Sequence, residues 1–164
     1  MLFGGQAVIL DPKSERGNWK ATRPWIADEI NIVNLTSDEV NKGLLDPFVI
    51  MRNEKDAESL AIDTLTFLTG ISSRDGEKFP VLRKAVRSVT QSETKGLLLV
   101  IDELRKEDTP ISRNIADHIE SFTDYDFAHL LFSDGKVEHA ISLEKQLNLI
   151  QVADLVLPAK EHNF

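Results

Sequence analysis

The chain has 164 residues, 41% of them hydrophobic and 28% charged, which is enough to bury the core of one globular domain. Its 19 basic and 27 acidic residues give a net charge of −8, which argues against general binding to nucleic-acid phosphates. The absence of cysteine excludes disulfides and thiolate metal sites, and no run of 18 apolar residues is present to span a membrane.

The first third of the chain predicts two strands and their loops. The run "QAVILDPK" is rich in β-branched residues and stops at Asp-Pro, which is typical of a buried strand of a parallel sheet. The run "EINIVNL", residues 29–35, alternates with the period of a strand. The polar connection between them holds both tryptophans, and a long loop, "TSDEVNKGLLDPF", follows the second strand.

The middle of the chain is predicted to be helical, with three or four helices packed together. One apolar stripe begins at Asn53 and ends at Gly70, another follows Pro80, and a third follows Thr109-Pro110. The stripes contain, in order, Ala57, Leu60, Ala61, Leu65 and Leu68; then Leu82, Ala85, Val86 and Val89; then Ile111, Ile115, Ile119 and Phe122.

The last part predicts a return to the sheet. A turn at Asp134-Gly135 precedes two extended runs, near residues 139–143 and 147–152. We therefore expect an α/β protein and a single domain over residues 1–164. Sheet strands and loops are expected in 6–50, a helical insertion in 51–132 and the returning strands in 133–158.

The stretch "LLLVIDELR", residues 97–105, has the form of the metal-binding acidic strand of a P-loop ATPase. That strand acts with a glycine-rich loop G-x-x-x-x-G-K-[ST], which this sequence does not contain. Leu97, Val100, Ile101 and Leu104 instead form a helical stripe. We predict a helix capped by Ser92 or Thr94, in which Asp102 and Glu103 face solvent.

Two groups of polar residues are candidate sites. Asp11, Lys13, Glu15 and Arg16 follow the first strand, where open α/β sheets place ligands; by residue types alone, an ordinary polar turn with a local ion pair is the favoured explanation. A basic stretch is either a solvated helix face or a contact for an acidic partner or DNA; it comprises Arg74, Lys78, Arg83, Lys84, Arg87 and Lys95. The four histidines lack metal-binding spacing, so no metal site is predicted.

Six segments, taken in order, resemble the ATP-binding transfer proteins of Gram-positive conjugative elements, which are type IV secretion ATPases of the HerA–FtsK superfamily. They are "AVILDPKSERGNW", "LLDPFVI", "AIDTLTFLTG", "FPVLRKAVRSV", "FAHLLFSDG" and "LNLIQVADLVLP". The resemblance runs from Ala7 to Pro158 and depends on the order and spacing of the segments.

The resemblance implies a fragment of a P-loop, RecA-like sheet with an inserted helical bundle. The family's phosphate loop precedes the first of these segments and its metal-binding strand follows the last, so both are expected outside this chain. ATP and Mg²⁺ are then cofactors of the full-length protein only. Asp11, Lys13, Glu15 and Arg16 are implied to lie near the nucleotide or a subunit boundary.

Two hypotheses for function remain open. In the first, the chain is an internal part of a conjugation ATPase and is inactive alone. The full ATPase acts at the inner, cytoplasmic face of the membrane, and its partners are other ATPase subunits and membrane channel proteins. An exposed sheet edge would then cause self-association. In the second, the chain is a free-standing helical module that binds a protein partner and has no enzymatic activity.

Overall fold

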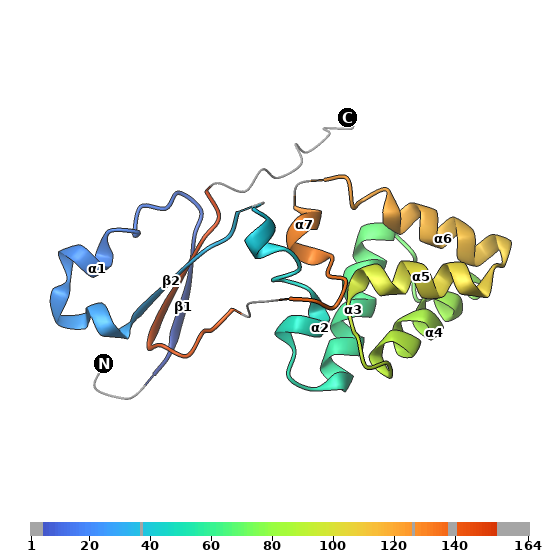
Figure 1. Cartoon of the computed structure of the whole chain (residues 1–164), viewed down its shortest axis with the longest axis horizontal. Coiled ribbons are helices and arrows are strands. Elements are labelled where there is room, and N and C mark those ends of the chain that lie inside the picture. Colours follow the sequence, from blue (N-terminus) through green and yellow to red (C-terminus); the bar gives the residue numbers. More distant parts are fainter. Residues whose placement is uncertain (1–4, 37, 126, 138–140, 154–164) are drawn as a thin grey trace. The chain divides into compact units, whose positions relative to one another are not determined.

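The computed structural model of the chain describes residues 5–36, 38–125, 127–137 and 141–153. The chain divides into two compact units (Figure 1). The sheet unit comprises residues 1–37 and 141–156, and the helical unit comprises residues 38–140 and 157–164. The domain ranges expected from the sequence stay a prediction.

The sheet unit contains three parallel strands in the order β1-β3-β2 (Figure 1). They are β1 Ala7–Asp11, β2 Ile30–Asn34 and β3 Leu147–Gln151. The pairing is in register, so Asp11 and Asn34 both lie opposite Gln151 where the three strands end. The predicted α/β class with parallel strands is confirmed, and so are the strand positions near 7–11, 30–34 and 147–151.

Strand β1 is less buried than its apolar sequence predicts. Val8 and Leu10 are exposed, whereas Asp11 is buried. Successive side chains of a strand point to opposite faces of the sheet, so Val8 and Leu10 share one face and Ile9 lies on the other. The prediction of a buried strand is therefore wrong for Val8 and Leu10, which are 53% and 62% exposed.

The connection from β1 to β2 is partly helical. It contains α1 Trp19–Thr22 and the 3-10 helix η1 Pro24–Glu29, whose first residue is a proline, as the first turn of a helix favours.

The predicted strand near residues 139–143 is wrong for residues 141–143, which have no strand pairing; residues 139 and 140 lie outside the described part of the chain. Side-chain hydrogen bonds, in place of the backbone hydrogen bonds of a strand, hold this segment. The Asn148 amide donates to the carbonyl oxygens of Leu143 at 3.3 Å and Lys145 at 2.7 Å. The segment that leads into β3 is thus held as a loop.

The helical unit is built around four helices of 11 to 16 residues, as the sequence predicts (Figure 1). They are α3 Glu54–Thr69, α4 Lys78–Thr90, α5 Leu97–Glu107 and α6 Pro110–Glu120. Shorter elements are η2 Glu39–Asn41, α2 Pro47–Ile50 and α7 Ala128–Leu131. No helix in the described residues has the length and hydropathy of a membrane span.

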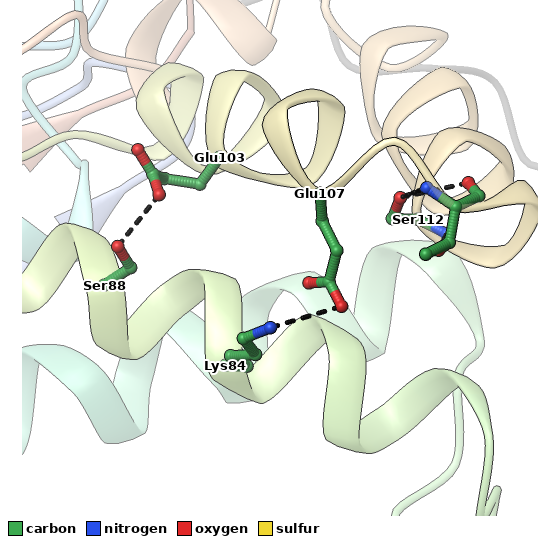
Figure 2. Close-up of polar contacts among 6 residues, drawn as sticks. Lys84, Ser88, Glu103, Glu107 and Ser112 are labelled. Carbon is green, nitrogen blue, oxygen red and sulfur yellow. Dashed lines mark hydrogen bonds and ion pairs between the residues drawn. The ribbon is translucent and has the colours of Figure 1, made fainter.

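Local capping explains where α3 and α6 begin and end. Asn53 accepts a hydrogen bond from the Asp56 N–H at 2.8 Å, and Gly70 adopts the left-handed φ of 68° that closes the helix. Thr109 and Ser112 form a reciprocal capping box at the start of α6 (Figure 2). These helix boundaries are confirmed.

The predicted apolar stripes form the core of the helical unit. Leu65, Leu82, Leu97, Leu104 and Ile115 are at most 1% exposed and belong to one cluster. Burying such side chains stabilises a fold by roughly 1.5–3 kcal/mol each relative to exposure. The core therefore depends on contacts among all four helices.

Asp46 joins three segments of the helical unit. Its side chain is fully buried and accepts hydrogen bonds from the backbone N–H groups of Phe48 at 2.9 Å, Leu97 at 2.7 Å and Ser133 at 3.0 Å. It thereby caps both α2 and α5. The prediction that Ser92 or Thr94 caps α5 is wrong, because Gly96 occupies the cap position and Asp46 supplies the acceptor from a distant part of the chain.

Burial raises the pKa of Asp46 to about 6, although its three backbone hydrogen bonds act to lower it. A carboxyl group whose pKa is higher in the folded than in the unfolded state favours folding when it is protonated. We expect the free energy of unfolding of the wild type, relative to Asp46→Asn, to increase as pH falls from 7 to 4. Urea titrations of both proteins across this range test the sign, and a relative decrease would contradict it.

Candidate functional site

Asp11 is the centre of the predicted polar site, at the end of β1. Its carboxylate accepts a hydrogen bond from the Arg16 N–H at 2.8 Å and pairs with the Arg16 guanidinium at 3.2 Å. The Gln151 amide, at the end of the neighbouring strand, donates to the same carboxylate at 3.5 Å. Asp11 therefore ties the loop after β1 to the end of β3.

The environment of Asp11 keeps it ionised. Burial acts to raise the pKa of Asp11, but the hydrogen bonds from Arg16 and Gln151 and the positive charge of Arg16 together lower it. The negative charge on Asp11 balances part of the charge on Arg16, whose side chain is 38% exposed.

The loop after Asp11 folds tightly back onto the strand ends. Ser14 adopts a left-handed φ of 53°, which is uncommon for a residue other than glycine. A Cβ on Gly17 would lie 3.1 Å from the Gln151 amide nitrogen, so a small residue suits this approach. Of the four predicted site residues, Asp11 and Arg16 are thus brought together, whereas Lys13 and Glu15 are exposed in the loop.

The two central groups at this edge of the sheet, the Asp11 carboxylate and the Arg16 N–H, already have partners within the protein. The Asp11 carboxylate is occupied by Arg16 and Gln151, and the Arg16 N–H is used by Asp11. Elsewhere in the described part of the chain, no group of three acidic or histidine side chains could hold a metal ion. We therefore derive no catalytic step through nucleotide or metal from these residues.

The basic stretch is partly neutralised by neighbouring helices. Lys84 pairs with Glu107 of α5 at 3.3 Å (Figure 2), and Arg87 pairs with Glu58 of α3 at 3.1 Å. Lys95 contacts Glu54. Arg74, Lys78 and Arg83 are exposed. Three of the six cations are thus paired with acids of the helical unit, and the contact with an acidic partner or DNA stays a prediction.

We expect Lys84→Gln and Arg87→Gln each to change the free energy of unfolding by less than about 1 kcal/mol, because exposed ion pairs contribute little. Denaturant titration measures this directly. A much larger loss would show that these pairs hold α3, α4 and α5 together.

The stretch "LLLVIDELR" is helical, as predicted, and lies in α5. Asp102 is exposed, whereas Glu103 is partly buried and accepts a hydrogen bond from the Ser88 hydroxyl at 2.8 Å (Figure 2). Glu103 also contacts Lys106. The prediction that both face solvent is correct for Asp102 only. Neither residue lies on a strand, so the metal-binding reading of this stretch has no structural support.

A protein-family model described as an AAA-like domain matches residues 1–164, and the chain belongs to this family. A search of curated proteins found no match.

Among solved structures, the chain is similar to VirB4 of Thermoanaerobacter pseudethanolicus, with a TM-score of 0.58 and 13% sequence identity. The similarity covers 92% of this chain and 60% of that one. At this identity the match establishes a shared fold: a small parallel sheet combined with several helices. The predicted resemblance and fold class are confirmed.

Sequence reasoning missed Gln151 and Asp46. Gln151 lies 140 residues from Asp11, and no local pattern connects them. Asp46 does have a local signal, since Asp-Pro is a common helix start and Asp46 caps α2. Its two other bonds reach Leu97 and Ser133, 51 and 87 residues away, and carry no such signal.

Proposed function

We propose that this chain is an internal part of the ATPase domain of a conjugation or type IV secretion ATPase, which energises the transfer of DNA or protein. The observation that carries the proposal is the family match over the whole chain, including both the strands and the helices. The fold shared with VirB4 supports the same assignment.

In this proposal, ATP and Mg²⁺ are bound by the rest of the parent protein and the chain alone does not hydrolyse ATP. Asp11 and Arg16 position the exposed Lys13 and Glu15 at the end of the sheet, near the nucleotide or a neighbouring subunit. The parent acts at the inner, cytoplasmic face of the membrane, with other ATPase subunits and channel proteins as partners.

The flanking coding DNA provides the first test. We expect a G-x-x-x-x-G-K-[ST] loop shortly before the segment that encodes β1, and an acidic strand after the segment that encodes β3. An intact locus without either motif would overturn the assignment.

Lys13→Ala in the longer protein tests the site. We expect the ATP hydrolysis rate to fall at least roughly tenfold, because a positioned cation near transferring phosphates stabilises the developing charge. Lys55→Ala is the matched control, since Lys55 is also exposed but lies on α3. Equal rates for both variants would remove Lys13 from the proposal.

Self-association through a sheet edge is a further part of the proposal. The Ala7 N–H donates to the Gln146 carbonyl, so the N–H groups of Val8 and Leu10 point away from β3, on the side where no described strand pairs. A second chain can pair there.

Val8→Pro is expected to weaken self-association, because proline removes one outward N–H and leaves the β1–β3 pairing intact. Sedimentation at several concentrations measures the change. Val8→Ala is the control, because it shortens the same side chain but keeps the outward N–H. If the wild type, Val8→Pro and Val8→Ala associate equally strongly, the contact between chains does not lie at the β1 edge.

The alternative of a free-standing helical interaction module is less well supported. The family match spans the sheet residues as well as the helices, whereas a helical module requires only the latter. A thermal shift of the isolated chain by ATP would count against that module, and equally against the statement that ATP is bound only by the rest of the parent protein, since a ligand that binds the folded state stabilises it.

A further inference from the structure

The connection between β1 and β2 contains an open hollow with an unusual lining. Its volume is about 520 Å³, and it is lined by Asn18, Trp19, Thr22, Arg23 and Trp25. Trp25 is 76% exposed. An exposed indole and a guanidinium, that of Arg23, thus line the same hollow.

Two arginines fix Trp19 in this hollow. The guanidinium carbon of Arg23 lies 4.4 Å from the centre of the Trp19 ring, and that of Arg16 lies 5.7 Å away. Both distances suit cation–π attraction. Arg16 is also paired with Asp11, but Arg23 forms no ion pair with a carboxylate of the described residues; its guanidinium donates to the Thr22 hydroxyl at 3.2 Å.

The local charge is opposite to that of the whole chain. Residues 13–23 contain Lys13, Arg16, Lys20 and Arg23 against one acid, Glu15, whereas the chain carries −8. Cations interleaved with aromatic side chains are the combination by which proteins bind unpaired nucleotides: the base stacks on a ring and the cations neutralise the phosphate.

We propose that this hollow binds a nucleotide unit, with the base stacked on Trp25 and the phosphate held by Arg23. The unit is supplied either by single-stranded DNA or by a free nucleotide. An acidic peptide would satisfy Arg23 but would make no particular use of the exposed indole. The inference goes beyond the proposed function, because it uses neither the Asp11 carboxylate nor ATP hydrolysis.

Intrinsic fluorescence reports on this site directly, because Trp19 and Trp25 are the only tryptophans in the chain. We expect a twelve-nucleotide oligothymidylate to quench the fluorescence saturably, and an equal length of duplex DNA to quench it much less because its bases are already stacked. ATP is titrated in parallel. Quenching by the oligonucleotide alone assigns the site to single-stranded DNA, and quenching by ATP alone assigns it to a free nucleotide.

Variants separate stacking from charge, with binding measured by the anisotropy of a labelled form of the ligand that quenches. Trp25→Leu is expected to weaken binding about tenfold and Trp25→Phe to restore much of it, since stacking needs an aromatic ring. Phe67→Leu is the matched control, because Phe67 is 87% exposed but lies on α3. Arg23→Gln is expected to weaken binding and reduce its salt dependence, whereas Arg83→Gln on α4 leaves both unchanged.

Three results would overturn the proposal: no quenching by either ligand, duplex DNA quenching as well as the single strand, or equal affinity of Trp25→Leu and Phe67→Leu. Far-UV circular dichroism of each variant confirms that the fold is retained. A failed binding test leaves the ATPase assignment intact, because the flanking DNA and the Lys13 variant test that assignment separately.

Discussion

Replacing Asp46 by alanine is expected to lower the free energy of unfolding of the helical unit by about 3 kcal/mol, because an unsatisfied buried donor costs roughly 1–3 kcal/mol. The substitution leaves the N–H groups of Phe48, Leu97 and Ser133 without their acceptor. Removal of a desolvated carboxylate offsets part of this loss.

Denaturant titration followed at 222 nm measures this effect, since the helical signal reports on this unit even if the sheet unit unfolds separately. Asp102→Ala is the matched control: it removes an exposed aspartate from α5 and should change stability by less than about 0.5 kcal/mol. Equal midpoints for the two variants would mean that Asp46 does not hold the three segments together.

Gly96→Ala is expected to destabilise the same unit by about 3 kcal/mol, because the new methyl group meets rigid backbone. A Cβ at this position would lie 2.2 Å from the carbonyl oxygen of Ser133 and 2.9 Å from the nitrogen of Gly135. The φ of Gly96 is 178°, an extended conformation open to any residue, so the cost is steric alone.

Gly76→Ala is the control for this substitution, because a Cβ at Gly76 meets nothing within 4 Å. That variant should be neutral or slightly more stable. Asp46 and Gly96 hold the same backbone junction, so the double variant should lose less stability than the sum of the two single losses. Strict additivity would show that the two residues act independently.

The features that could be predicted from the sequence are those set by neighbours along the chain. Asn53, Gly70 and Thr109 mark helix ends through bonds within a few residues, and the apolar stripes set which helix faces are buried. The position of Asp11 at the end of a strand was predictable for the same reason.

The features that could not be predicted depend on distant segments. The exposure of Val8 and Leu10 depends on what covers the sheet, not on their own apolar character. The hydrogen bonds from Gln151 to Asp11 and from Leu97 to Asp46 join residues 140 and 51 positions apart. Periodicity carries no information about such pairs.

The strand order has a consequence for how the chain acquires its structure during synthesis. In the sheet of the described residues, β1 and β2 are not hydrogen-bonded to each other, and each pairs with β3, which begins at Leu147. A ribosome must therefore synthesise the chain as far as β3 before either early strand can form the pairing described here, whereas α3 to α6 depend on contacts much closer along the chain. Until β3 is made, the backbone N–H and C=O groups of β1 and β2 lack the partner that β3 supplies. Chaperone binding is therefore expected to concentrate on this early segment.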